Sequence, residues 1–304
     1  MKRKIVKLGT ATLVTSLPSK WIKRYGLKQG DEIDVAEEGN TLLLTSKGEI
    51  PSRECTIKVE KPERLISRQL FNTYRKGYDN IRVEFDDPSI LGYLQSKISM
   101  LMGFEIMESG ENYCILRNIA RIEEKEFDNI LRRMLLLTKT IAKDSFEAAR
   151  DSKYSLLDNV IQLEATQNKL YLFCSRAINK IGNIKIETPS LMYLFVQRVE
   201  DIADSYKAIC EEIKDKKLVL NKETLGLYSD VNDYLDSLYD FFYSFDNIKG
   251  KRIMEEKKRL LDRAGSLLEK IPKKEIFIIH LLMEAIIDIY EASSPVFGMN
   301  IFQS

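Results

Sequence analysis

From residue 123 to residue 294 almost every apolar side chain recurs at helical spacing, which leaves little room for any fold but a helix bundle in that half. Six helical segments are predicted, over residues 123–150, 153–182, 187–215, 221–246, 250–270 and 273–294. Most of the breaks between them contain Gly, Asn or Pro, as expected between antiparallel helices. We therefore predict an all-α domain over residues 121–304, built as two three-helix repeats at about 123–215 and 221–295.

The opposite end of the chain is distinguished by charge. Residues 1–28 contain eight Lys or Arg and no Asp or Glu, although 47 basic and 46 acidic side chains give the whole chain a net charge of +1. A nearly neutral chain has no global attraction to nucleic acid or acidic lipid, so such a role needs local segregation of charge. The basic block is a candidate DNA contact, and the ordinary alternative is a solvated surface.

The first 48 residues read as a β-β-α-β-β unit. Residues 5–8 and 13–17 form two β-rich runs, and "SKWIKRYG" follows as a short helix with Pro18 in its first turn, Ser16 or Leu17 at its cap and Gly26 after its end. "LKQGDEIDV" and "GNTLLLTS" predict a second hairpin that turns at Gly39-Asn40. So small a unit has too little apolar material for its own core and should need a partner.

Residues 51–120 predict a small α/β segment. "CTIKVE" and "NIRVEF" read as strands, "PERLISRQLFNTYRKG" and "SILGYLQSKISMLMG" as helices, and "FEIMES-GEN-YCILRNI" as a hairpin, which gives the order β-α-β-α-β-β. Gly77 and Gly103 fall at helix ends, where a left-handed residue is expected. No glycine cluster follows a strand, so a phosphate-binding loop is not indicated. We expect a structural role, as a spacer or as a surface that helps the chain dimerise.

Several function classes are excluded by absences in the sequence. The four cysteines are far apart without a C-x-x-C pair, which disfavours a zinc ribbon and a disulfide framework. No run of about 18 apolar residues and no signal-peptide core occurs, so we expect a soluble cytoplasmic protein without membrane insertion. With one histidine, no nucleophile elbow and no P-loop, we expect no enzyme, although metal-assisted hydrolysis by carboxylates stays open.

Two predicted helices carry acids at a spacing of four. Glu200 and Asp204 form one pair, and His280, Glu284 and Asp288 form a stripe within the apolar run "IFIIHLLMEAIIDIY". Like charges at this spacing repel, so an opposing cation or basic side chain is needed if they are buried. Carboxylates on neighbouring helices make metal sites in bundles, whereas the simpler alternative is an exposed polar stripe. Oxygen ligands with one imidazole would suit iron, manganese or magnesium.

The string "KLGTATLVTSLPSKWIKRYGLKQGDEIDVAEEGNTLLL" resembles the AbrB/SpoVT/MazE swapped-hairpin DNA-binding domain, over residues 1 to about 48. The resemblance implies a homodimer in which two chains exchange hairpins to complete one small β-barrel. It also implies that the basic strand and helix face double-stranded DNA. The implied DNA-binding residues are Lys2, Arg3, Lys4, Lys7, Thr10, Thr12, Lys20, Lys23 and Arg24.

The segments "ATQNKLYLFCSRAI", "YLFVQRVEDIADSYKAICEEI" and "HLLMEAIIDIYEASSPVF" resemble the PhoU family, over residues 121 to about 298. That family carries E(D)xxxD motifs that can bind iron or zinc, and the fusion resembles archaeal phosphate-uptake regulators. The motif matches Glu200/Asp204 and Glu284/Asp288 intact and Glu164 in part, because Asn168 replaces the aspartate. The fifth predicted helix has lost the motif, which argues against a multinuclear cluster.

The resemblances imply a DNA-binding transcriptional regulator linked to phosphate homeostasis, whose PhoU-like half senses a signal or partner. The alternative is a PhoU-like metal-binding adaptor that acts through phosphate-transport or signalling proteins, with the N-terminal unit serving only to dimerise. An antitoxin is a further alternative, since the same barrel occurs there. It is disfavoured because about 250 residues of globular appearance follow the barrel, rather than a short segment that folds on a toxin.

Overall fold

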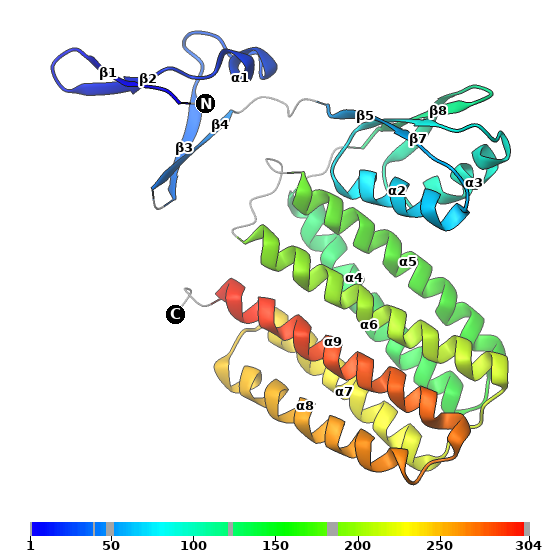
Figure 1. Cartoon of the computed structure of the whole chain (residues 1–304). Coiled ribbons are helices and arrows are strands. Elements are labelled where there is room, and N and C mark those ends of the chain that lie inside the picture. Colours follow the sequence, from blue (N-terminus) through cyan, green and yellow to red (C-terminus); the bar gives the residue numbers. More distant parts are fainter. Residues whose placement is uncertain (1, 39, 47–51, 121–123, 181–187, 301–304) are drawn as a thin grey trace. The chain divides into compact units, whose positions relative to one another are not determined.

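The structure is a computed structural model that describes residues 2–38, 40–46, 52–120, 124–180 and 188–300. The chain divides into two compact units, Met1–Arg53 and Glu54–Ser304, which we call the head and the body. The helices and strands of both carry their labels in Figure 1. The predicted boundary between an α/β domain at residues 51–120 and a helical domain at 121–304 stays a prediction.

The head contains two antiparallel hairpins and one short helix. β1 (Ile5–Leu8) pairs with β2 (Thr12–Thr15), and β3 (Ile33–Glu38) pairs with β4 (Thr41–Ser46). α1 (Ser19–Arg24) lies between the two hairpins along the chain. The predicted order of strands and helix is confirmed. Of the predicted second turn, Gly39 lies outside the described residues.

The predicted cap of α1 is wrong by one or two residues. Pro18, rather than Ser16 or Leu17, precedes the helix as its cap, with φ −63° and ψ 123°. A proline has no N–H to satisfy, and its carbonyl accepts from the N–H groups three and four residues on, at 2.9 and 3.0 Å. Gly26 follows the helix with φ +62°, the left-handed conformation expected there.

The head has no hydrophobic core of its own. None of its side chains whose exposure is described is buried. Large apolar side chains on both hairpins stand in solvent, with exposed fractions of 70 % for Ile5, 67 % for Leu13 and 64 % for Leu42. The hairpins form two separate two-stranded sheets, so the described part of the head closes no barrel by itself. Because two-stranded hairpins are marginally stable in water, these faces need a partner surface.

The body begins with a four-stranded mixed sheet and two helices. They are β5 (Glu54–Lys58), α2 (Glu63–Arg75), β6 (Asn80–Glu84), α3 (Ser89–Ile98), β7 (Phe104–Ser109) and β8 (Tyr113–Asn118). The strand order is β5-β6-β8-β7, with β5 parallel to β6 and the remaining pairs antiparallel. This arrangement confirms the predicted β-α-β-α-β-β order. Gly77 and Gly103 adopt φ +82° and +79°, as predicted for the ends of the two helical segments.

Six long helices make up the rest of the body. They are α4 (Glu124–Arg150), α5 (Tyr154–Asn179), α6 (Pro189–Lys216), α7 (Lys222–Tyr243), α8 (Asn247–Leu268) and α9 (Ile276–Asn300), with a short 3-10 turn at Lys273–Glu275. Each predicted helical segment is confirmed, with shifted ends. α4, α5 and α6 pack together, as do α7, α8 and α9, and the two groups meet along α6 with α9 and α4 with α7 (Figure 1). No helix in the described residues is both long and apolar enough to cross a membrane.

The largest difference at a helix end concerns α9, which was predicted to stop at residue 294. The helix continues to Asn300 with Pro295 inside it. A proline in a helix removes one N–H donor and crowds the preceding turn, which normally ends the helix. Here the turn after Pro295 is held by tertiary packing, because Val296 is fully buried and the Phe297 ring lies 5.0 Å from the ring of Phe241. Packing therefore outweighs the local cost.

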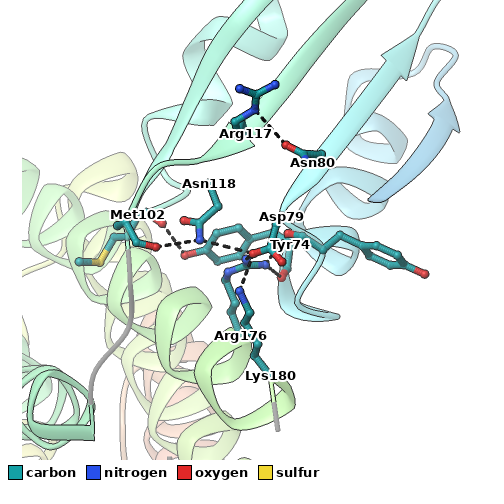
Figure 2. Close-up of polar contacts among 10 residues, drawn as sticks. Tyr74, Asp79, Asn80, Met102, Arg117, Asn118, Arg176 and Lys180 are labelled. Carbon is teal, nitrogen blue, oxygen red and sulfur yellow. Dashed lines mark hydrogen bonds and ion pairs between the residues drawn. The ribbon is translucent and has the colours of Figure 1, made fainter. Parts of the chain in front are cut away.

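The α/β part of the body packs on the helices mainly through α2 and α5. At this contact Arg176 of α5 is fully buried, and its Nη1 donates to the carbonyl oxygens of Tyr74 and Tyr78 at 3.0 and 2.7 Å. Its Nη2 donates to Asp79 Oδ1 at 2.7 Å, and Lys180 Nζ reaches the same oxygen at 2.6 Å (Figure 2). We call these residues the Arg176 anchor. The anchor joins the end of α2 to the last turns of α5.

Candidate functional site

The predicted DNA-binding residues are all in the described part of the head, and all of them are exposed. Lys2, Arg3 and Lys4 precede β1, and Lys7 lies within it. Thr10 lies in the turn between β1 and β2, where Gly9 has φ +69°. An exposed position is what contact with a phosphate backbone requires.

The register of the first hairpin separates two of these residues. Lys7 stands opposite Leu13, while Thr12 stands opposite Leu8. Because side chains alternate between the faces of a strand, Lys7 and Thr12 point from opposite faces of the hairpin. A flat approach of the hairpin to DNA can therefore use only one of the two.

α1 presents the clearest basic surface in the head. Lys20, Lys23 and Arg24 are exposed and lie three and four residues apart, so they share one side of the helix. Trp21 and Tyr25 are half-buried, with ring centroids 5.4 Å apart. Basic residues in the last turn also stabilise a helix through its dipole, which is an ordinary structural reason for two of the three.

The first group of predicted metal ligands lies where α5 meets α6. Glu164 of α5 is almost fully buried, and its Oε2 accepts an ion pair from Lys207 Nζ of α6 at 2.9 Å. Its Oε1 is buried without a hydrogen-bond partner. Glu200 and Asp204 of α6 lie near enough for their charges to act on one another. We call Glu164, Glu200, Asp204 and Lys207 the carboxylate cluster.

Proton affinities within this cluster are strongly shifted. Burial, helped by the nearby carboxylates of Asp204 and Asp201, raises the pKa of Glu200 to about 8. The Asp204 side chain reaches solvent, yet partial desolvation and then the carboxylate of Glu164 raise its pKa to about 6, against the opposing effect of Lys207. The cluster therefore has three carboxyl groups and only one basic side chain, Lys207. At neutral pH, Glu200 is expected to hold a proton.

Glu200 is also connected to the α/β part of the body. Arg75 Nη1 of α2 donates to the Tyr171 hydroxyl, which donates to Gln197 Oε1 at 2.5 Å. Gln197 Nε2 in turn donates to Glu200 Oε2 at 2.8 Å. This chain of hydrogen bonds runs from α2 through α5 to α6. The sequence predicted neither of its two intermediates, Tyr171 and Gln197, because the contacts join residues 96 and 26 positions apart.

The second group, on α9, is more exposed than the first. His280 Nε2 lies 3.3 Å from Glu284 Oε1, and their side chains are 59 % and 48 % exposed. Asp288 is less exposed and accepts from Arg198 Nη1 of α6 at 3.1 Å. Burial and the carboxylate of Asp201 raise the pKa of Asp288 to about 6, although Arg198 opposes the shift. For His280 and Glu284 the exposed polar stripe describes the structure best.

The structure only partly brings the two groups together. Asp204, Glu284 and Asp288 line one open groove of about 690 Å³ between α6 and α9, whereas Glu200 does not line it. Each group also contains an ion pair with a basic side chain, Lys207 with Glu164 and Arg198 with Asp288. Within the described residues, no three His, Cys, Asp or Glu side chains are arranged to hold a metal ion. The structure therefore contains the basic side chains that were expected to oppose the acids, and metal binding stays a prediction.

The raised pKa of Glu200 gives stability a pH dependence of definite sign. When an acid has a higher pKa in the folded chain, the folded chain binds more protons, so the free energy of unfolding falls as the pH rises through that interval. For Glu200 the interval runs from 4.5 to about 8. We expect the free energy of unfolding in urea to fall across this interval by on the order of 1–3 kcal/mol, and Glu200→Gln to flatten the decline. Glu211→Gln, at an exposed position of the same helix, is the control, and equal slopes in both variants would contradict the assignment.

Comparison with known proteins finds a match for the head only. Residues 6–52 match the family described as antidote-toxin recognition MazE, bacterial antitoxin. The match begins within β1, continues through β4 and ends before β5. No curated protein and no solved structure matches the chain. The predicted AbrB/MazE-like character of the N-terminal unit is thus confirmed, while the PhoU-like character of the helices stays a prediction.

Proposed function

We propose that this protein is a DNA-binding transcriptional regulator, active in the cytoplasm, whose dimeric head binds duplex DNA and whose body receives a signal linked to phosphate supply. The observation that carries the proposal is the block of exposed basic side chains without an acid, within a span that matches a MazE-type domain. The phosphate link rests only on the resemblance of the helices to the PhoU family. No catalytic residue is proposed.

Dimerisation through the head follows from its missing core. Apolar side chains such as Ile5, Leu13 and Leu42 stand on hairpins that bury nothing in one chain. An exchange of hairpins with a second copy would cover both faces at once and close one barrel. Two copies of the basic block would then contact one duplex.

Salt dependence of DNA binding is the direct test. Each phosphate that a basic residue neutralises releases condensed counterions, so affinity should fall steeply with salt. We expect the full chain to bind fluorescent duplex DNA in an anisotropy titration. The affinity should fall by at least about 100-fold between 50 and 200 mM salt. Binding that ignores salt, or no binding at low salt, would contradict the proposal.

An antitoxin is the second function that a specific observation favours, because the matching family is described as one. Antitoxins of this kind follow the barrel with a segment that folds on the toxin. Here the residues after the head form a compact unit from Glu54 onward, with an extensive buried core. The regulator therefore fits the chain better. The adaptor alternative differs from it in needing no DNA contact.

We also propose that the carboxylate cluster binds a divalent cation. Oxygen ligands suit iron, manganese or magnesium, with zinc less favoured, and Oε1 of Glu164 is a buried oxygen without a partner. Lys207 supplies the positive charge in the structure, so a bound cation would compete with its ammonium group. Asn168 and the lost motif on α8 argue for one ion rather than several.

Elemental analysis and thermal unfolding test the cation. Protein purified without chelator should contain metal, and added manganese should raise Tm of the wild type by several degrees, roughly 2–4 °C per kcal/mol of binding energy. The variant Glu200→Gln with Asp204→Asn should lose both effects. Glu211→Gln with Asp215→Asn changes an equally spaced, exposed pair on α6 and should keep them. A metal-free wild type whose Tm ignores added metal would rule the cation out.

A further inference from the structure

β5 is an edge strand with one free side. It pairs with β6 along one edge, and along the other it pairs with no strand in the described part of the chain. Val59 N–H donates to Glu84 O of the β6 side at 2.9 Å. Because backbone groups alternate along a strand, Cys55 and Ile57 also direct their N–H and C=O groups to β6. Glu54, Thr56 and Lys58 direct these groups to the free edge, where the carbonyl oxygen of Lys58 accepts a long hydrogen bond from Gln69 Nε2 at 3.5 Å that a new strand would replace. An unpaired edge of this kind is a template for another strand.

We propose that β5 pairs antiparallel with β5 of a second copy of this chain, centred on Thr56, so that the two sheets become one continuous sheet. In this register Thr56 faces Thr56 of the second copy, and Glu54 faces its Lys58. These are the residues whose N–H and C=O groups point outward. They therefore form the hydrogen-bonded pairs of the new ladder.

The charges of β5 make this register self-complementary. Glu54 and Lys58 are exposed, they stand at equal distances from Thr56, and their side chains share one face of the strand. A symmetric antiparallel pairing therefore sets a carboxylate opposite an ammonium group twice. Opposite charges directly across a ladder stabilise it, and like charges destabilise it. Both residues have present partners that they can exchange. Lys58 pairs with Asp86 at 2.9 Å, and Glu54 Oε1 accepts from Asn80 Nδ2 at 2.9 Å, and both contacts are exposed to solvent.

The inner face of β5 is suited to the same occupant. Cys55 and Ile57 point toward the core of the α/β layer but are only half-buried, because the sheet ends at this strand. In the proposed register Cys55 lies across from Ile57 of the second copy as a close, non-hydrogen-bonded pair. The apolar layer beneath the sheet would then continue across the two copies.

The opposite edge of the sheet lacks these properties. β7 carries a bulge between Ile106 and Glu108, which interrupts a regular ladder. Its charged residues are the exposed Glu105 and Glu108, so two copies would bring only acids together. Bulges and like charges are common ways to protect an edge from pairing. Of the two edges, β5 is the one compatible with a symmetric partner.

The chain also holds the two strands near each other, an argument that rests on the proposed dimeric head. β5 begins at Glu54, directly after the last residue of the head. Dimerisation through the heads would confine the two β5 strands to a small volume. Pairing then becomes intramolecular and needs little intrinsic affinity. The body of the regulator would be a symmetric unit rather than two independent appendages.

Cysteine cross-linking in the full chain tests the register. Paired hydrogen-bonded residues have Cα atoms about 5.5 Å apart, within the range that a disulfide spans. Thr56→Cys should therefore form a covalent dimer under mild oxidation, at low micromolar protein, in most of the chains. Ser109→Cys at the end of β7 and the wild type are controls and should stay mostly uncross-linked. Equal yields for the two cysteine variants would overturn the proposal.

Charge exchange in the Thr56→Cys background makes the test specific. Glu54→Lys or Lys58→Glu alone sets like charges opposite each other at two places, and we expect cross-linking about tenfold slower. The two changes together restore both opposite pairs and should recover the rate. A double variant as slow as the single ones would contradict the register.

The outcome also separates this inference from the proposed function. DNA titration of the wild type reports on the head and does not depend on β5, whereas sedimentation detects a dimer held by either contact. A dimer that binds DNA but shows no specific cross-link at residue 56 refutes the β5 pairing alone. A monomer that binds no DNA refutes the proposed regulator, and in that case cross-linking that is specific at high protein concentration would still support the strand pairing.

Discussion

The full chain with Lys4, Lys7 and Arg24 changed to Glu should bind duplex DNA at least about 100-fold more weakly than the wild type at about 100 mM salt. The three residues are exposed on β1, on α1 and directly before β1, and no acidic residue stands near them in the first 28 positions. Each change removes a phosphate contact and adds a repulsive charge. A dimer would lose six contacts, so the slope of log affinity against log salt should also become shallower by about 5.

A matched charge change elsewhere separates the head from the net charge. Lys222, Lys273 and Lys274 are exposed on the helical part of the body, and changing them to Glu alters the net charge by the same amount. That variant should bind DNA within about threefold of the wild type, because the altered charges lie outside the contact. If both variants lose binding equally, the attraction is global and no DNA surface exists in the head. If neither variant loses DNA binding and regulation persists, the alternative of an adaptor that acts through protein contacts is favoured.

The strand and helix order of the head could be predicted because each element carries a local signal. Gly26 marks the end of α1, and two short β-rich apolar runs mark β1 and β2. The cap at Pro18 was missed because a proline can serve either at the boundary or in the first turn. The opposite faces of Lys7 and Thr12 depend on the hairpin register, which the loop decides.

For the carboxylate cluster, the sequence pattern predicts the pair of acids but not their basic partner. Spacing places Glu200 and Asp204 on one side of α6, and such acids need an opposing charge wherever they are buried. Spacing does not identify the basic side chain that pairs with these acids. Lys207 lies on the same helix, three residues beyond Asp204, and reaches across to Glu164, so the ion pair depends on how α5 and α6 pack. A lysine at i+3 from an acid is the signal that could have indicated it.

Packing of the α/β segment on the helices was not predicted, although one residue signalled it. Arg176 stands in the otherwise apolar run "YLFCSRAI" of α5, where a charged side chain is expected only if it is satisfied by partners. Its partners are two carbonyl groups at the end of α2 and Asp79, about 100 residues earlier in the chain. Such long-range partners have no periodicity that a sequence pattern can reveal.

The Arg176 anchor gives the largest expected change in stability. We expect Arg176→Met to lower the free energy of unfolding by about 3–5 kcal/mol, measured by urea denaturation followed by circular dichroism. The substitution keeps much of the side-chain volume beside Tyr74 and Phe104, whose ring centroids lie 5.0 and 4.9 Å from the guanidinium carbon. It removes the donor to the buried carbonyl group of Tyr74, to the partly buried carbonyl group of Tyr78 and to Asp79, which retains Lys180 (Figure 2). Buried acceptors without donors carry their full desolvation cost.

An exposed arginine of the same layer is the matched control. Arg82 pairs with Glu84 at 2.8 Å, but their side chains are 40 % and 45 % exposed, so Arg82→Met should cost less than about 1 kcal/mol. Hydrogen exchange adds a local readout, because loosening of the anchor should expose the amides of α2 before those of α7. A loss of stability equal to that of the control, with α2 still protected, would show that shape and apolar area hold the α/β layer on α5. In that case the buried guanidinium group of Arg176 would not be needed for stability.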